Sequence, residues 1–143
     1  MKKLILYASL FTIILFTACK KDDPEATKTE LLTNGSWILT ALVSDEDGNG
    51  TYEENDFALF PNCIRDNFYI FKTNFDLEVN EGATKCDPLD PQLDFLTWSF
   101  ASNETILIID NDSNTILELN TATLKLKVDN GGGTSSVITF TKR

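Results

Sequence analysis

The chain has 143 residues, the length of a single domain, and its composition excludes several classes of function. It carries 22 aspartates and glutamates against 12 lysines and arginines, a formal net charge of −10, and such a surface repels nucleic acid and anionic headgroups. It contains no histidine, which removes the commonest zinc ligand and the usual general base of an enzyme. We therefore expect no nucleic-acid partner.

Residues 1–18 have the pattern of a secretory signal peptide. Met1-Lys2-Lys3 gives a positive start, and residues 4–16 form an apolar run that small residues follow. The run is too short to span a membrane comfortably. A buried N-terminal helix is the alternative reading of the same residues.

The end of this segment, Phe16-Thr17-Ala18-Cys19, resembles a bacterial lipobox. The resemblance implies that Cys19 is lipidated, and acyl chains contribute about 0.8 kcal/mol per buried CH₂ to membrane anchoring. Residues 19–28 would then be a lipid-anchored polar tether. Its Lys20-Lys21-Asp22-Asp23 run looks like the signal that exports some lipoproteins to the outer face of the outer membrane, although a solvated charged tether would look the same. We expect an outer-membrane lipoprotein, exposed at the cell surface or otherwise on the periplasmic face.

The rest of the chain reads as a short helix followed by strands. Residues 25–33 are good helix formers, and Asn34-Gly35 is a plausible stop. Short runs rich in β-branched, aromatic and alternating apolar residues then alternate with turn residues. The predicted strands are 37–43, 67–72, 75–80, 93–100, 105–110, 115–120, 123–129 and 135–141.

The alternation within these strands predicts an antiparallel sheet with one wet face. In the strand at 123–129, for example, Leu124, Leu126 and Val128 point one way while Lys125 and Lys127 point the other. Sequential hairpins favour an all-β, eight-stranded up-and-down barrel over residues 29–143, because closure leaves no exposed edge. An open sandwich is the rival architecture.

With Cys19 acylated, Cys63 and Cys86 remain as an even pair in an oxidising compartment, for which a disulfide is the default and free thiols the alternative. A two-residue turn at Asn74-Phe75 would place the two cysteines opposite one another across a hairpin. The same register would turn Phe68, Ile70, Leu77 and Val79 to one face. Phe75 disfavours the positive φ of such a turn, and a longer loop or a bulge would shift the register.

Gly35-x-Trp37, after a short helix and at the start of the first strand, resembles the opening of lipocalins. In that family a late basic side chain packs over the tryptophan at the closed end, a role that Lys142 or Arg143 would fill. Three further segments resemble the small lipocalin-like domains of bacterial lipoproteins: Cys63-x-x-Asp66-x-x-Tyr69-x-Phe71, Gly82-x-x-Lys85-Cys86 and residues 96–100.

The resemblance implies binding of a small hydrophobic ligand within the cup. The side chains that we expect to line the interior are all apolar, and their bulk would either surround a ligand or fill the barrel. They are Phe68, Ile70, Leu77, Val79, Leu96, Trp98, Phe100, Leu124, Leu126, Ile138 and Phe140.

The acidic loop after the first strand has the spacing of a calcium site. Oxygen-bearing side chains and a glycine recur as in a calcium loop, with Gly50 at the sixth position for a sharp turn. The candidate ligands are Asp45, Asp47, Asn49, Thr51, Glu53 and Asp56. A solvated acidic turn, in which the same residues serve backbone geometry, is the alternative.

No catalytic constellation is visible, and we do not expect an enzyme. The sequence predicts a lipid-anchored, monomeric binding protein that holds a small hydrophobic ligand or a protein partner at the barrel mouth. The alternative is a structural or interaction module with a filled barrel, stabilised by calcium.

Overall fold

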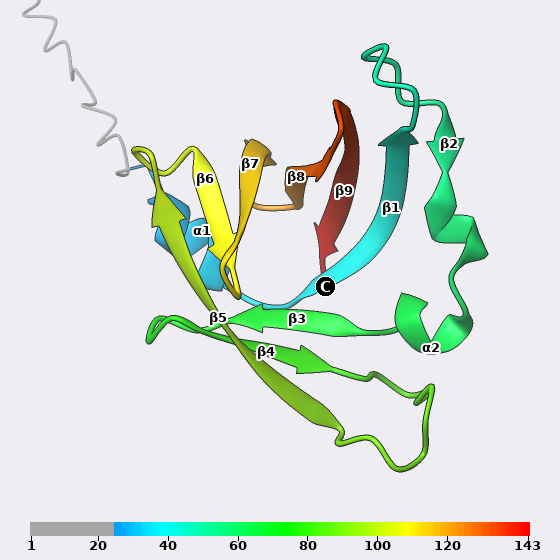
Figure 1. Ribbon diagram of the computed structural model, residues 1–143. Coiled ribbons are helices and arrows are strands. Elements are labelled where there is room, and N and C mark those ends of the chain that lie inside the picture. The colour runs from blue at the N-terminus through cyan, green and yellow to red at the C-terminus, as the bar shows by residue number, and fades with distance from the viewer. Residues whose placement is uncertain (1–24) are drawn as a thin grey trace, which may run out of the picture.

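The computed structural model describes residues 25–143 as a barrel of antiparallel strands (Figure 1). The predicted signal peptide, the predicted lipid site Cys19 and most of the predicted tether lie outside the described residues. The elements in chain order are α1 (Lys28–Thr33), β1 (Trp37–Asp45), β2 (Glu54–Asn55), the 3-10 helix η1 (Asp56–Leu59), α2 (Asn62–Arg65), β3 (Phe68–Phe71), β4 (Asp76–Asn80), β5 (Leu93–Ala101), β6 (Ile106–Ile109), β7 (Asp112–Leu119), β8 (Thr123–Gly131) and β9 (Thr134–Lys142).

The strands close into a barrel in the order of the sequence. Strand β1 pairs with β3, each later strand pairs with the next, and β9 pairs back with β1 along nearly its whole length. Eight strands therefore form a closed up-and-down barrel, and β2 is a two-residue addition. This confirms the predicted fold class and rules out the open sandwich.

One edge of β1 is shared between two partners. Trp37 and Ile38 pair with β3, whereas Val43 and Ser44 pair with β2. Strand β1 is thus hydrogen-bonded to β3 only at its start. After β1 ends, the chain passes through β2, η1 and α2 before it re-enters the barrel at β3. In Figure 1 β2 lies beside the far end of β1, and α2 lies next to the beginning of β3. The two ends of the barrel consequently differ: one is sealed and the other is open.

Helix α1 seals the closed end. Thr27 and Glu30 form a capping box at its start, with the Thr27 hydroxyl accepting from the Glu30 amide and the Glu30 carboxylate accepting from the Thr27 amide. Leu32 is fully buried in the core. The indole Nε1 of Trp37 donates to the Leu32 carbonyl at 2.8 Å, so the helix is tied directly to the first strand.

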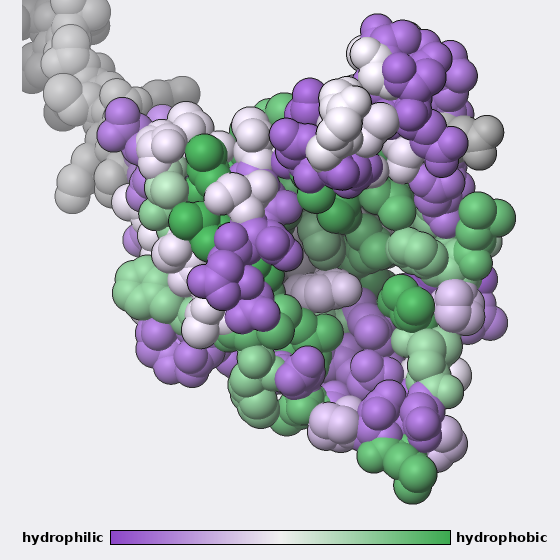
Figure 2. Space-filling view, viewed as in Figure 1, coloured by the Kyte–Doolittle hydropathy of each residue, from purple (hydrophilic) through white to green (hydrophobic). Residues whose placement is uncertain are grey.

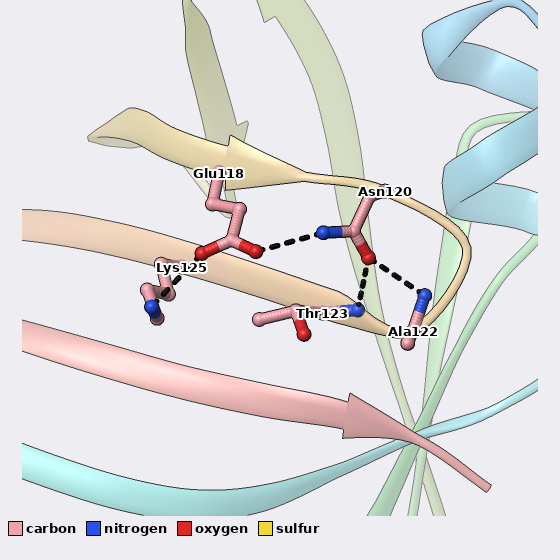
Figure 3. Close-up of polar contacts among 5 residues, drawn as sticks. All are labelled: Glu118, Asn120, Ala122, Thr123 and Lys125. Atoms are coloured by element: carbon pink, nitrogen blue, oxygen red, sulfur yellow. Dashed lines mark hydrogen bonds and ion pairs between the residues drawn. The ribbon is translucent and has the colours of Figure 1, made fainter.

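The turn between β7 and β8 lies at the same end and is held by one asparagine (Figure 3). The Asn120 Oδ1 accepts from the amides of Ala122 and Thr123, and its Nδ2 donates to Glu118. Glu118 also forms an ion pair with Lys125 at 2.9 Å. The hydrogen bond from Lys125 is the largest cause that lowers the pKa of the Glu118 carboxyl, and the hydrogen bond from Asn120 lowers it further. The network fixes the hairpin that carries much of the core.

The core occupies the closed half of the barrel. Its edge-to-face aromatic contacts centre on Trp98, whose ring lies 5.7 Å from Phe71 and 5.4 Å from Phe100 between centroids. The buried members of the cluster are Leu32, Trp37, Phe71, Leu77, Trp98, Leu107, Leu124 and Leu126. Burying a large apolar side chain contributes about 1.5–3 kcal/mol, so this half of the barrel is the main source of stability.

Candidate ligand-binding mouth

The hairpin of β3 and β4 is shifted by one residue from the predicted register. Tyr69 pairs with Val79 and Phe71 pairs with Leu77, whereas the sequence had placed Ile70 opposite Val79. The reason is the loop: Lys72 and Asp76 close a three-residue turn rather than the predicted two-residue one, because the Lys72 amide donates to the Asp76 carbonyl at 2.8 Å.

The extra loop residue is Thr73, and the last loop residue, Phe75, adopts φ 70° despite its bulk. Tertiary contacts favour this conformation: its carbonyl accepts from the Trp98 amide at 2.9 Å, and its ring centroid lies 5.3 Å from that of Trp98. The predicted inward positions of Phe68 and Ile70 are therefore wrong. Both lie on the outer face, where the guanidinium of Arg143 sits 4.8 Å from the centroid of the Phe68 ring.

The other predicted interior residues fall on the inner face. Leu77, Trp98, Leu124 and Leu126 are in the buried cluster, and the side chains packed against that cluster include Val79, Leu96, Phe100 and Phe140. Ile138 pairs with Leu126 and Leu42 and lies nearer the open end, where it lines a pocket. The packed cluster fills the closed half, so any ligand must enter from the open end.

Tyr69 is an inward residue that the predicted register placed on the outer face. Its ring packs edge-to-face on Phe140 with centroids 5.2 Å apart. Burial, followed by the negative charge of Glu81, raises the pKa of its phenol. The sequence signal at Phe75 does not separate the two registers, because the φ of Phe75 is positive in the observed turn as well as in a two-residue one.

A pocket of about 450 Å³ opens at the mouth, between β6, β7, β8 and β9. Ile109, Val128 and Ile138 give it an apolar lining. Asp112 and Asn114 supply inward polar side chains from β7, and Ser113 and Asp129 border the pocket from the outward positions of β7 and β8. Figure 2 shows the hollowed face of the molecule, with apolar surface inside the hollow and hydrophilic surface around it. An apolar lining with a few polar groups is the usual composition of a small-molecule site.

Asn114 is the most buried polar residue of this pocket. Its side-chain Nδ2 donates to the backbone carbonyls of Leu107 and Asp112, at 3.2 and 3.0 Å. The sequence placed Asn114 in a turn, but the turn is only Asp110-Asn111, both at positive φ, so β7 begins at Asp112. The shorter turn moves Asn114 into the strand and onto the inner face.

A second polar group lies along β1 and β9 at the mouth. The Ser44 hydroxyl donates to the Asp56 carboxylate at 2.6 Å and lies 3.1 Å from the Ser136 hydroxyl. Asn130 in turn donates to Ser136 at 2.8 Å. Ser44 and Ser136 face one another across the β1–β9 pairing, which puts this chain of hydrogen bonds on the same inner face as Leu42 and Ile138.

The six predicted calcium ligands are not brought together. Asp56 contacts Ser44 on the inner face of β1, whereas the neighbouring Asp45 is buried on the outer face, because successive strand residues alternate. Asp45 is 4% exposed; its Oδ2 accepts from the Gly50 amide, and its buried Oδ1 has no hydrogen-bond partner in the described part of the chain.

The remaining predicted ligands serve the loop itself. Asp47 accepts from the backbone and side-chain amides of Asn49, and Asn49 accepts from the Thr51 amide, as in tight Asx turns. Asp47, Thr51 and Glu53 border a small pocket of about 210 Å³. Among residues 25–143, no three Asp, Glu, Cys or His side chains are arranged to hold a metal ion.

The predicted disulfide between Cys63 and Cys86 is formed and ties α2 to the loop after β4. Asp66 reinforces it, since its Oδ2 accepts from the amides of Ala83 and Thr84 at 3.1 and 2.9 Å. Gly82 packs directly against Asp66: a Cβ at position 82 would lie 2.4 Å from the Asp66 carbonyl oxygen. This explains why aspartate and glycine accompany the two cysteines in the sequence.

No family model matches the sequence, and no curated protein matches it. Among solved structures, a DUF4847 family protein from Bacteroides vulgatus is similar over 80% of this chain and 96% of its own, with a TM-score of 0.54 and 13% identity. A lipocalin-like protein from Bacteroides uniformis aligns over 79% of this chain and 99% of its own, with a TM-score of 0.44 and 18% identity. At 13% identity the first likeness concerns the fold alone, and membership of a lipoprotein family stays a prediction.

Proposed function

We propose that the protein is a binding protein, not an enzyme, whose barrel mouth holds a small ligand with an apolar body. The observation that carries this proposal is the mouth pocket: Ile109, Val128 and Ile138 offer apolar surface directly above a close-packed core. A ligand with an apolar portion would gain about 25 cal/mol for each Å² that it buries there. The monomeric state expected from the sequence is part of the same proposal.

The test uses a neutral fluorescent probe, N-phenyl-1-naphthylamine, so that charge does not decide the result. We expect saturable binding that the Val128→Trp variant weakens at least tenfold, because the indole would occupy the pocket. Val137→Trp is the matched control, since Val137 lies on the outer face opposite Lys127 and Val43. Equal binding by both folded variants, or no binding by the unmodified protein, would refute the proposal.

We also propose that the chain is anchored through lipid on Cys19, at the outer membrane. No helix within residues 25–143 is long and apolar enough to cross a membrane. Support comes from the closed end, where the described chain begins: Lys28 Nζ donates to the Glu104 carbonyl in the β5–β6 turn at 2.5 Å. A tether entering here would point the mouth away from the bilayer.

Anchoring is tested by expressing the full chain and the Cys19→Ser variant in a bacterium that processes lipoproteins. The unmodified protein should carry acyl chains by mass spectrometry and fractionate with outer membranes. The variant should lose both properties. Protease treatment of whole cells distinguishes the cell surface from the periplasmic face. An unacylated, soluble product from the unmodified chain would contradict the proposal.

A second candidate function is a structural module with a filled barrel, which the dense packing around Trp98 favours. The calcium site predicted in residues 45–56 belongs to this alternative, and the unpartnered Oδ1 of Asp45 is the observation in its favour. Binding would require the loop to rearrange, because Asp45 and Asp56 lie on opposite faces of β1. A melting temperature raised by Ca²⁺ but not by Mg²⁺, and unchanged by calcium in Asp47→Ala, would support the site. Identical melting in both ions would discard it.

A further inference from the structure

The negative charge of the protein is concentrated at the open end. Between residues 25 and 143 there are 20 aspartates and glutamates and eight lysines and arginines. The segments at the open end hold 14 of the acidic residues and only two of the basic ones, whereas the rest of the described chain holds six of each. These segments, here called the mouth segments, are 45–67, 81–94, 110–112 and 129–133.

The two basic residues of the mouth segments are engaged locally. Arg65 donates through its guanidinium to the side-chain oxygen of Asn62, and Lys85 donates to the Asp90 carbonyl. Neither lines the mouth pocket. The formal charge of the mouth is therefore about −12, with no basic side chain in the pocket lining to offset it.

The pocket itself presents acceptors. Asn114 is 7% exposed, and both of its recorded hydrogen bonds use Nδ2, which leaves the carbonyl oxygen Oδ1 without a donor in the described part of the chain. Asp112 lines the same pocket on the same face of β7. Asp129 borders it from β8, but its side chain alternates with that of Val128 and lies on the outer face, where its Oδ1 accepts from the Gly131 amide.

An accessible carbonyl oxygen without a protein donor is free to accept from a ligand, and hydrogen bonds from charged donors are the stronger ones. The apolar side chains beneath it call for an apolar body in the same ligand. A fatty-acid anion would have the apolar body but would meet the Asp112 carboxylate and the Asn114 carbonyl oxygen, so it would be repelled. A cation without an apolar body would leave Ile109, Val128 and Ile138 unused.

We propose that the mouth selects cationic amphiphiles, that is, small molecules with an apolar body and a primary ammonium or guanidinium head. This inference rests on the proposed function and specifies its ligand class. The head would donate to Asn114 Oδ1 and to the carboxylate of Asp112, while the body packs on the apolar side chains. The charge of the mouth segments would raise the local concentration of such cations before they dock.

Three ligands of equal chain length test the inference: octylammonium, octanol and octanoate, titrated by calorimetry at pH 7 and low ionic strength. We expect octylammonium to bind about tenfold more tightly than octanol, and octanoate to bind most weakly. Added salt should weaken octylammonium binding and leave octanol binding unchanged, because it screens exposed charges.

The Asp112→Asn variant should reduce octylammonium affinity to that of octanol. The matched control is Glu104→Gln, which changes the net charge equally but in an exposed residue near the closed end. Equal losses in both variants would mean attraction by net charge alone and would overturn the inference. So would equal binding of octanol and octylammonium, although the proposed function would then stand. Failure of all three ligands together with the neutral naphthylamine probe would overturn both.

Discussion

The ammonium of Lys142 lies 4.3 Å from the centroid of the Trp37 ring and donates to the Leu31 carbonyl at 2.7 Å. The end of β9 is thereby tied to both the first strand and the first helix. The methylenes of Lys142 also pass 3.8 Å from the position that a Cβ on Gly35 would take. This geometry confirms the expectation that a late basic residue packs over the tryptophan, and it identifies that residue as Lys142, not Arg143.

The ammonium charge and the methylene chain of Lys142 contribute separately to the free energy of unfolding. Burial lowers the pKa of Lys142, because desolvation disfavours its charged form, so Trp37 and Leu31 must offset that cost. We expect Lys142→Met to lose about 1 kcal/mol in urea unfolding, through the lost hydrogen bond and cation–π contact. Lys142→Ala should lose about 2 kcal/mol, because the methylenes go as well. A Met variant as stable as the unmodified protein would show that the charge contributes nothing net.

Gly82 should be intolerant of any side chain. It has φ +70°, and an added Cβ would lie 2.4 Å from the Asp66 carbonyl oxygen, which the backbone holds in place. We expect Gly82→Ala to cost about 3 kcal/mol, combining backbone strain with the clash. Gly132→Ala isolates the strain, since Gly132 has φ +65° but open space around it, and should cost about 1 kcal/mol. Similar losses for the two variants would contradict the contact with Asp66.

The disulfide should stabilise the region beside the mouth. Cys63 and Cys86 are separated by 23 positions, and closing a loop of this size contributes about 3 kcal/mol in the chain-entropy model. The Cys63→Ala/Cys86→Ala variant should therefore unfold at lower urea concentration, and reductant should shift the unmodified protein by the same amount without affecting the variant. Alkylation of Cys63 and Cys86 in the denatured protein without prior reduction would show that the bond is absent.

Most of the fold could be predicted from the sequence because its strands are short, alternate regularly and are separated by turn residues. Each predicted strand has a counterpart, and Leu124, Leu126 and Val128 share the inner face as expected. The register between β3 and β4 could not be predicted in the same way. It depends on Phe75 at a φ that phenylalanine disfavours, and the contacts with Trp98 that favour it connect residues distant in sequence.

The candidate site was less predictable than the fold. Asn114 was assigned to a loop because Asn111-Asp112-Ser113-Asn114 reads as turn residues, but two residues suffice for the turn when both accept positive φ. The calcium-site prediction required residues 45–56 to form one continuous loop. Because Asp45 is the last residue of β1, the alternation of the strand separates it from Asp56, which contacts Ser44 on the opposite face.

The pKa of the Tyr69 phenol indicates how far water penetrates the mouth. Burial, with a smaller contribution from Glu81, raises the pKa of its phenol above the usual value of 10.0. The unfolded chain therefore ionises first as the pH rises, so the stability that the neutral phenol contributes is present below pH 10 and is lost as the pH rises through the folded pKa. Tyr69→Phe should remove this alkaline loss of stability.

The direct measurement is ¹³C NMR of tyrosine labelled at Cζ, with Tyr52→Phe used to assign the two resonances of residues 25–143. We expect Glu81→Gln to move the pKa of Tyr69 only part of the way back, because desolvation is the larger cause. Addition of octanol should raise that pKa further if the ligand excludes water from the inner face. A Tyr69 resonance that titrates at the ordinary value would mean that water reaches the ring, and the dry core would then begin deeper, at Phe71.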